Sequence, residues 1–321
     1  MSSYYNDEDV PRGRKPSHDS TSDWIKEAIT RGMEVLDVDE SLKQIAAHIT
    51  TKGEWEKAVV SPSLVATVCQ LARLKKYLGH APLPGRPLHM ATAAARPSAI
   101  SLINMDRGFL AEGLLVSALK AGLGEDRIIA SAPTYTPRWQ DPTTRIVYTG
   151  HPDVLVLNDQ EDAELVQMKC PSVRKFERVE KLGDEDALET YRAQMVTELF
   201  IARADPGGWM PRGMVGMSHF PGRNNLVLFA WEHTGKDVKP RLHVVPLDWD
   251  ETMETIPLAM GDEIEHDAAL ALGQGIWPEG YPEHQWNVWP CNYCAYSRLG
   301  DYTDVDNVIP KCDDHARWEG K

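Results

Sequence analysis

Short apolar runs rich in β-branched residues occupy the middle of the chain. The runs 146–148 and 154–157, separated by a polar stretch, are expected to form one strand. A third run covers 165–169 after the polar residues 158–162. Runs of this length and composition favour strands, and a cluster of Asn, Asp and Gln between them favours a turn. The pattern therefore predicts a β-hairpin over residues 144–170.

The third run carries two polar side chains on one of its faces, because successive side chains point to opposite sides of a strand. The faces are Leu165, Gln167 and Lys169 on one side and Val166, Met168 and Cys170 on the other. We expect the apolar face, including the Cys170 thiol, to pack on the core. The opposite face then presents an oxygen ligand and an ammonium beside Asp153, a layout typical of a magnesium-dependent phosphodiesterase.

Helical spacing of apolar residues surrounds this hairpin. The predicted helices are 24–36, a segment from Ser61-Pro62 to about 79, 109–120, 184–203 and 248–272. The helix over 184–203 has the strongest pattern, since acids fill its first turn and a Pro-Gly-Gly sequence ends it. Two more strands are expected, at 226–231 and 242–247. Strands mixed with helices predict an α/β fold.

The composition changes towards both ends of the chain. Residues 1–20 are polar and predict a disordered tail, and 80–98 are rich in Pro and Gly and predict a loop. We divide the remainder into a helical N-terminal region, 21–100, a core, 101–275, and a cysteine-bearing segment, 276–321. This last segment has little periodicity, which suits a segment held by a metal centre.

Composition and charge narrow the class of protein. The chain has 321 residues, 42% hydrophobic and 26% charged, which suits one globular domain with additions. Its net charge of −14 argues against a simple DNA-binding module, which is usually basic. No apolar run approaches the ~20 residues of a membrane span. A polar N-terminus without a signal peptide and an odd number of cysteines predict a cytoplasmic protein.

Five short motifs contain residue types found in hydrolytic metal sites and metal clusters. They are Gly150-His151-Pro152-Asp153 with Gln167-Met168-Lys169, Arg107-Gly108 with Glu112, Tyr191 with Gln194, the series Ser63, Cys69 and Tyr77, and Cys291 and Cys294 with Cys312. In this order they resemble the PD-(D/E)XK nuclease superfamily. The lambda-exonuclease-like and RecB-like branch is most similar, including the CRISPR-associated iron–sulfur exonucleases and their phage relatives. The resemblance spans about residues 60–315.

The resemblance implies a restriction-endonuclease-like core, with a mixed central sheet flanked by helices. It also has departures. Gln167 stands where the family usually has Glu or Asp, which removes one negative charge. Glu198 stands where a Tyr often follows the helix Gln, and Tyr191 could partly substitute on the same helix face. Seventeen residues separate Cys294 from Cys312, a long gap for the family.

By the resemblance, the site binds one or two Mg²⁺ or Mn²⁺ ions through oxygen ligands. Asp153 is implied as the principal, bridging ligand. Gln167 contributes its amide oxygen and Met168 its main-chain carbonyl. Glu112, from the neighbouring helix, completes the implied ligand set, directly or through water.

The resemblance also implies roles for residues that do not bind metal. Lys169 is implied to orient the attacking water and to stabilise the developing charge. Gln194 is implied to hold the site or a DNA phosphate, and His151 is a further candidate beside Asp153. Glu164 lies on the opposite strand face from Gln167, so we do not expect it to replace the missing carboxylate.

Cys291 and Cys294 form a pair that can bind one metal together with two further soft ligands. The resemblance implies that Cys69 and Cys312 supply these ligands and that a [4Fe–4S] cluster links the two ends of the nuclease region. Four thiolates also suit structural Zn²⁺, with His315 as an alternative fourth ligand. The sequence leaves both cofactors open.

The hypothesis is a metal-dependent DNA exonuclease that processes DNA ends in recombination, repair or replication and is encoded by a bacteriophage. One alternative is an end-trimming nuclease of the CRISPR-adaptation type. Others are a catalytically silent DNA-binding scaffold, favoured by Gln167, and a structural zinc protein. The expected partner is DNA, with a helicase, an annealing protein or an integrase as possible protein partners. The expected location is the cytoplasm, of the host if a phage encodes the chain.

Overall fold

The computed structural model describes residues 23–36, 59–67, 99–131, 137–144, 146–204, 221–234 and 237–274, with a few further positions between 39 and 77. The predicted tail 1–20, the loop 80–98 and the segment 276–321 lie outside these residues, and the proposed division into domains remains a prediction. Among the described residues, no helix combines the length and apolar character needed to cross a membrane.

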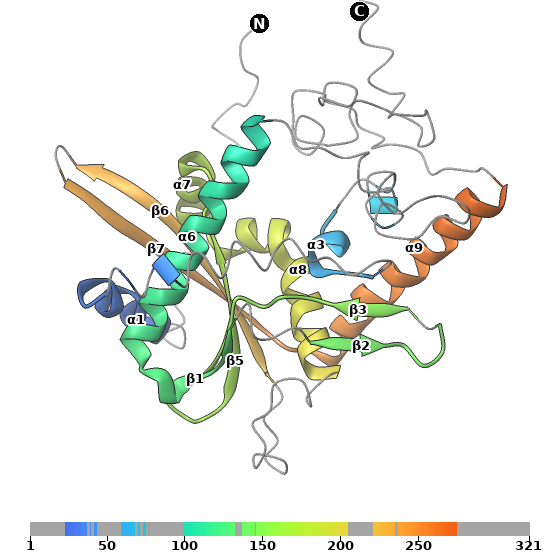
Figure 1. The fold of residues 1–321 in the computed structure, drawn as a ribbon, viewed down its shortest axis with the longest axis horizontal. Coiled ribbons are helices and arrows are strands. Elements are labelled where there is room, and N and C mark those ends of the chain that lie inside the picture. Colours follow the sequence, from blue (N-terminus) through green and yellow to red (C-terminus); the bar gives the residue numbers. More distant parts are fainter. Residues whose placement is uncertain are drawn as a thin grey trace, which may run out of the picture.

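A mixed five-stranded sheet forms the centre of the molecule (Figure 1). Its strands, in spatial order, are β1 (Ile128–Ser131), β4 (Val154–Leu157), β5 (Ala163–Lys169), β6 (Arg223–Thr234) and β7 (Asp237–Asp248). β5 and β6 run parallel, and every other neighbouring pair is antiparallel. β4 and β5 form the predicted hairpin, with its turn at 158–162 as expected.

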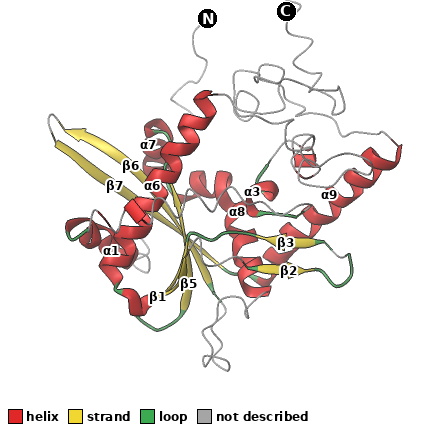
Figure 2. Cartoon of the chain, in the orientation of Figure 1, coloured by secondary structure: helices red, strands yellow, loops and turns green. Residues whose placement is uncertain are grey.

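Helices cover both faces of this sheet, so the core has three layers (Figure 2). On one face, α1 (Asp23–Glu34) and α6 (Ala99–Leu123) pack on alternate residues of four strands, including Val166 and Met168 of β5. On the other face lie α7 (Val173–Leu182) and α8 (Asp184–Ala204). This arrangement confirms the predicted α/β class with a mixed sheet flanked by helices.

α1 and α6 approach each other closely through two glycines. A Cβ atom added to Gly32 would collide with the carbonyl oxygen of Ala118, and one added to Gly122 would collide with that of Ala28. Arg31 donates to the Gly122 carbonyl oxygen from Nε (3.1 Å) and Nη2 (2.6 Å), near the end of α6. Because side-chain guanidinium groups can satisfy the last carbonyls of a helix, this contact fixes the end of α6 against α1.

A smaller two-stranded sheet joins the main core on the α8 side. It comprises β2 (Arg138–Gln140) and β3 (Val147–Thr149), and it packs on α3 (Pro62–Val65), α8 and α9 (Thr255–Gln274). Tyr148 is fully buried there and meets Phe200 of α8 edge to face, with ring centroids 5.6 Å apart. Ser61 caps α3 by accepting from the Leu64 amide, as its position before Pro62 predicts.

Several sequence predictions needed correction. Residues 147–149 form β3 and pair with β2, while 154–157 form β4 in the main sheet, so the two runs expected to make one strand lie in different sheets. α6 begins at Ala99, ten residues before the expected start. β1, β2 and α7 were not predicted. Cys170 is exposed rather than packed in the core, because β5 ends at Lys169 and the chain then turns into α7.

Candidate functional site

The carboxyl end of β5 brings together residues from both hairpin strands. Val154 of β4 pairs with Val166 of β5, so Asp153, one residue before β4, lies level with Gln167. The Asp153 carboxylate accepts a hydrogen bond through Oδ2 from the Met168 amide, at 2.7 Å. Asp153 is 4% exposed and Gln167 1% exposed. A buried carboxylate is therefore held on the strand by a main-chain donor.

Lys169 connects this strand end to α6. Its ammonium donates to Glu112 Oε1 at 3.1 Å and to the carbonyl oxygen of Met168 at 3.0 Å. Glu112 is 6% exposed and projects from the middle of α6. Burial lowers the pKa of Lys169, but the nearby carboxylates of Glu112, Asp153 and Glu198 outweigh it and raise that pKa above its ordinary value. Lys169 is therefore a stable ammonium at neutral pH.

A buried glutamate on α8, which the sequence hypothesis did not include in the site, lies beside Gln167. Glu198 Oε1 accepts from Gln167 Nε2 at 3.0 Å and from Gln194 Nε2 at 3.2 Å. Its Oε2 accepts from Asn224 Nδ2 at 3.3 Å. Glu198 is 5% exposed and lies one helical turn after Gln194. Gln194 thus contacts the site through Glu198.

The charge of Glu198 is coupled to the rest of the site. Burial, with a smaller contribution from Asp153, raises its pKa to about 8, although Lys169 and the side-chain donors oppose this shift. The sequence contains a signal that points to Glu198 as a partnered, buried residue. It is the one charged residue in the buried run 195–202 of α8, where an uncompensated charge would be costly.

The amide oxygen of Gln167 has an unusual environment. It is buried and accepts no hydrogen bond from any described residue, while the amide nitrogen is held by Glu198. A buried acceptor without a partner costs about 1–3 kcal/mol, which a cation at this oxygen would offset. The carboxylates of Asp153 and Glu112 and the carbonyl of Met168 lie at the same end of β5, and oxygen donors of these kinds are those that hard divalent cations prefer.

A metal site built only from ionisable side chains is not present in the described part of the chain. No three His, Cys, Asp or Glu residues there gather as a metal-binding group. The candidate donor set at β5 differs because two of its four groups, an amide and a main-chain carbonyl, are not ionisable. The cysteines predicted to hold a cluster, Cys69, Cys291, Cys294 and Cys312, lie outside the described residues, so the cluster remains a prediction.

Two other predicted residues have defined places near the site. Tyr191 of α8 is partly buried, and its ring lies 4.7 Å from the Lys175 ammonium. Burial raises the pKa of Tyr191, and its electrostatic neighbours include Lys169 and Glu112. His151 lies half-buried in the segment between β3 and β4, two residues before Asp153.

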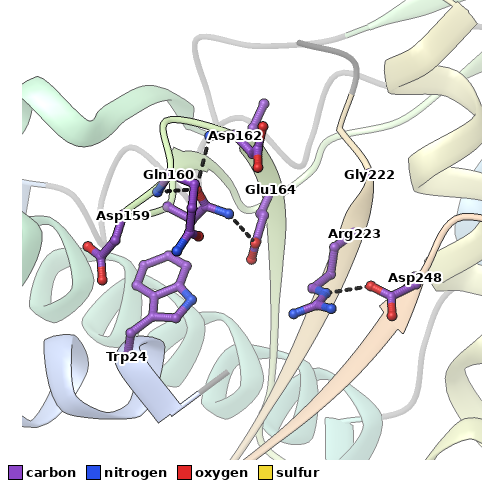
Figure 3. A pocket seen from close by; sticks show the side chains of 10 residues that line it. Trp24, Asp159, Gln160, Asp162, Glu164, Gly222, Arg223 and Asp248 are labelled. Carbon is purple, nitrogen blue, oxygen red and sulfur yellow. Dashed lines mark hydrogen bonds and ion pairs between the residues drawn. The ribbon is translucent and has the colours of Figure 1, made fainter. Parts of the chain in front are cut away.

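Glu164 lies at the opposite end of β5, which agrees with its exclusion from the site. Its carboxylate accepts from Asn158 at 2.8 Å and from Asn225 at 2.7 Å. It borders a polar pocket of about 600 Å³ that also includes Trp24, Arg223 and Asp248 (Figure 3). At about 3.3 Å per residue, this pocket is roughly 16 Å along the strand from Lys169. It is therefore separate from the site at the carboxyl end.

Comparisons with known proteins give only distant similarity. No protein-family model matches the chain, and no curated protein sequence matches it. Among solved structures, the crystal structure of SSO0001 is similar with a TM-score of 0.38 and 13% identity, covering 80% of this chain and 91% of that chain. The alkaline exonuclease LHK-Exo from Laribacter hongkongensis has a TM-score of 0.40 and 15% identity, covering 68% of this chain and 93% of that one.

LHK-Exo in complex with dAMP gives a TM-score of 0.40 and 16% identity, with 68% and 93% of the two chains covered. These TM-scores and identities are too low to establish a shared fold. A functional assignment therefore depends on the residues gathered at the carboxyl end of β5.

Proposed function

We propose that this chain is a Mg²⁺- or Mn²⁺-dependent deoxyribonuclease that hydrolyses phosphodiester bonds at DNA ends. The observation that supports it is the meeting of Asp153, Gln167 and Lys169 at one strand end, with Glu112 reaching Lys169 from α6. The orphaned Gln167 oxygen supports a cation in this place, because no protein donor among the described residues satisfies it.

The cation would be held by Asp153, Gln167 Oε1, the Met168 carbonyl and Glu112. When bound, it supplies charge neutralisation for the phosphate and an activated water. The Asp153 carboxylate is already oriented by the Met168 amide, which limits the reorganisation that binding requires. This pre-organisation is the contribution of the β4–β5 hairpin.

Lys169 acts as a donor and not as a base. In the metal-free chain the carboxylates around Lys169 raise its pKa and favour the protonated ammonium, which supports a donor role. A fixed ammonium can instead hold the attacking water and stabilise negative charge on the phosphate oxygens. The link to Glu112 positions this ammonium, because it restricts a side chain that otherwise has many rotamers.

The exonuclease mode, the branch of the nuclease superfamily and the cluster rest on the sequence motifs. We propose an exonuclease of the lambda-exonuclease-like and RecB-like branch, encoded by a phage, which works in the host cytoplasm in recombination, repair or replication. Cys69, Cys291, Cys294 and Cys312 would hold a [4Fe–4S] cluster, with Zn²⁺ as the alternative. End trimming of the CRISPR-adaptation type is an alternative biological role for the same chemistry.

The test is a cleavage assay on anaerobically purified protein with end-labelled single- and double-stranded DNA. Mg²⁺, Mn²⁺ and a chelator are compared, with Lys169→Ala as the site variant and Lys181→Ala, an exposed lysine of α7, as the matched control. We expect metal-dependent shortening that Lys169→Ala loses and Lys181→Ala keeps. Internal cuts without shortening would overturn the exonuclease mode, and no cleavage under any condition would overturn the nuclease.

A silent DNA-binding scaffold is the second candidate, and one observation favours it. Position 167 carries an uncharged amide, which lowers the negative charge available to a cation. This candidate predicts DNA binding that is independent of divalent metal and no cleavage in Mg²⁺ or Mn²⁺. The same assay with a gel-shift measurement separates the two candidates.

A further inference from the structure

The missing carboxylate at position 167 has a neighbour that can compensate for it. Glu198 lies 31 residues further along the chain, yet its Oε1 is 3.0 Å from Gln167 Nε2, because α8 packs on the face of β5 that carries Gln167. The described chain therefore places a carboxyl group directly behind the amide of the strand, within the buried layer between sheet and helix.

The hydrogen bonds around Glu198 define the orientation of the Gln167 amide. In its ionised form, which a cation at the site would favour over the protonated form, the Glu198 carboxylate can only accept, so it selects the nitrogen side of the amide. The amide oxygen must then face away from Glu198, and it is one of two buried side-chain oxygens without a hydrogen-bond partner among the described residues, the other being Asn224 Oδ1. The orientation that satisfies Glu198 is thus the one that presents an oxygen to a cation.

The carboxylate itself is already fully engaged. Gln167, Gln194 and Asn224 all direct side-chain nitrogens at it, two on Oε1 and one on Oε2. Asn224 is also tied to the Met195 carbonyl at 3.1 Å, so the arrangement is anchored on both β6 and α8. A carboxylate held by three amides suits a supporting role behind a ligand better than a direct bond to metal.

We infer that Glu198 is the positioning residue of the metal site: it fixes the Gln167 amide with its oxygen towards the cation and, in its ionised form, supplies one layer behind the negative charge absent from position 167. This inference rests on the proposed function. Gln167 then supplies the oxygen ligand from the strand, and Glu198 supplies the carboxylate from the helix. It also explains why the helix carries a glutamate in an apolar run.

The test exchanges the two side chains. The variants are Glu198→Gln, the double exchange Gln167→Glu with Glu198→Gln, and Glu164→Gln as control. Glu164 matches Glu198 closely, since it is 6% exposed and held by two asparagines, but it lies at the other end of β5. Binding of MnCl₂ is measured by isothermal titration calorimetry without DNA, after circular dichroism has shown that each variant is folded.

We expect Glu198→Gln to weaken Mn²⁺ binding by about 10- to 100-fold, the usual cost of losing a residue that orients a metal ligand. The double exchange should return the affinity to within a few-fold of the wild type, because it moves the charge to position 167 and keeps the hydrogen bond. Glu164→Gln should bind Mn²⁺ like the wild type. A purely structural role for Glu198 would give no such recovery.

The outcomes separate this inference from the proposed function. If the wild type binds Mn²⁺ and cuts DNA, but Glu198→Gln binds Mn²⁺ equally well or the double exchange fails to recover, the inference alone is overturned. If the wild type neither binds Mn²⁺ nor cuts DNA, both the proposed function and the inference are overturned.

Discussion

The ammonium of Lys169 lies 3.1 Å from Glu112 Oε1, which connects the end of β5 to the middle of α6. Two of the elements that form the site therefore belong to different layers of the fold. The geometry of the strand is set by sheet pairing, whereas the position of Glu112 depends on how α6 packs. The packing of α6 against α1 thus bears directly on the site.

Lys169→Met should lower the rate of DNA cleavage by about 10²–10³-fold, because removing one preorganised donor to developing charge has this typical cost. Methionine keeps most of the length of the side chain, so packing changes little. Cleavage is measured at saturating Mn²⁺ with Lys181→Met as the surface control. A Lys169→Met variant with wild-type activity would remove Lys169 from the mechanism.

Gly122→Ala should destabilise the protein by about 1–3 kcal/mol, since the added methyl group meets the Ala28 carbonyl where α1 and α6 touch. Gly108→Ala is the matched control on the same helix, because no described atom lies within 4 Å of the added Cβ atom. Its expected effect is neutral or stabilising by up to about 1 kcal/mol. Urea unfolding of both variants makes the comparison, and equal effects would contradict the close contact.

Local patterns in the sequence predicted the hairpin and the end of it at which Asp153, Gln167 and Lys169 meet. Alternation along 165–169 places Gln167 and Lys169 correctly on one side of the strand, and the acidic first turn marks the start of α8. Short strands such as β1 and β2, of three or four residues, leave too little periodicity to detect. Most residues of α7 are charged, and its buried side is limited to Phe176 and Val179, which is too short an apolar pattern to predict a helix.

Contacts distant in sequence account for the rest of the differences. The runs 146–148 and 154–157 were expected to form one strand, but Tyr148 pairs with β2 and with Val60, which places the first of these runs in the smaller sheet. Glu198 was noted only as a departure from a family Tyr. Its contact with Gln167 depends on the rotation of α8 over the sheet, which no local pattern determines.

Cys291→Ser should remove visible absorbance from anaerobically purified protein if the predicted [4Fe–4S] cluster is present, and it should lower the melting temperature. The reason is that one lost thiolate leaves the cluster with an incomplete ligand set. Absorbance spectra and metal analysis are recorded with Cys170→Ser, the exposed cysteine after β5, as control. Colourless wild-type protein that contains zinc would replace the iron–sulfur hypothesis with the zinc alternative.

The buried carboxylate of Glu198 gives the metal-free protein a defined pH dependence. Burial raises its pKa to about 8 in the folded chain, whereas a glutamate in the unfolded chain titrates near ~4.3. Between these values the folded state binds more protons than the unfolded state, so stability falls as pH rises through that window. The loss is complete once the pH exceeds the folded pKa.

Glu198→Gln should therefore reduce the loss of stability between pH 5 and pH 8 in the presence of a chelator, because a glutamine in this place carries no charge to bury. Thermal melts of the wild type and the variant at four pH values within the window provide the measurement. The variant should be relatively more stable at pH 8 than at pH 5, although it binds Mn²⁺ more weakly. Parallel curves for the two proteins would show that Glu198 does not titrate there. Opposite effects on stability and metal affinity are expected when a residue is retained for function at a cost to the fold.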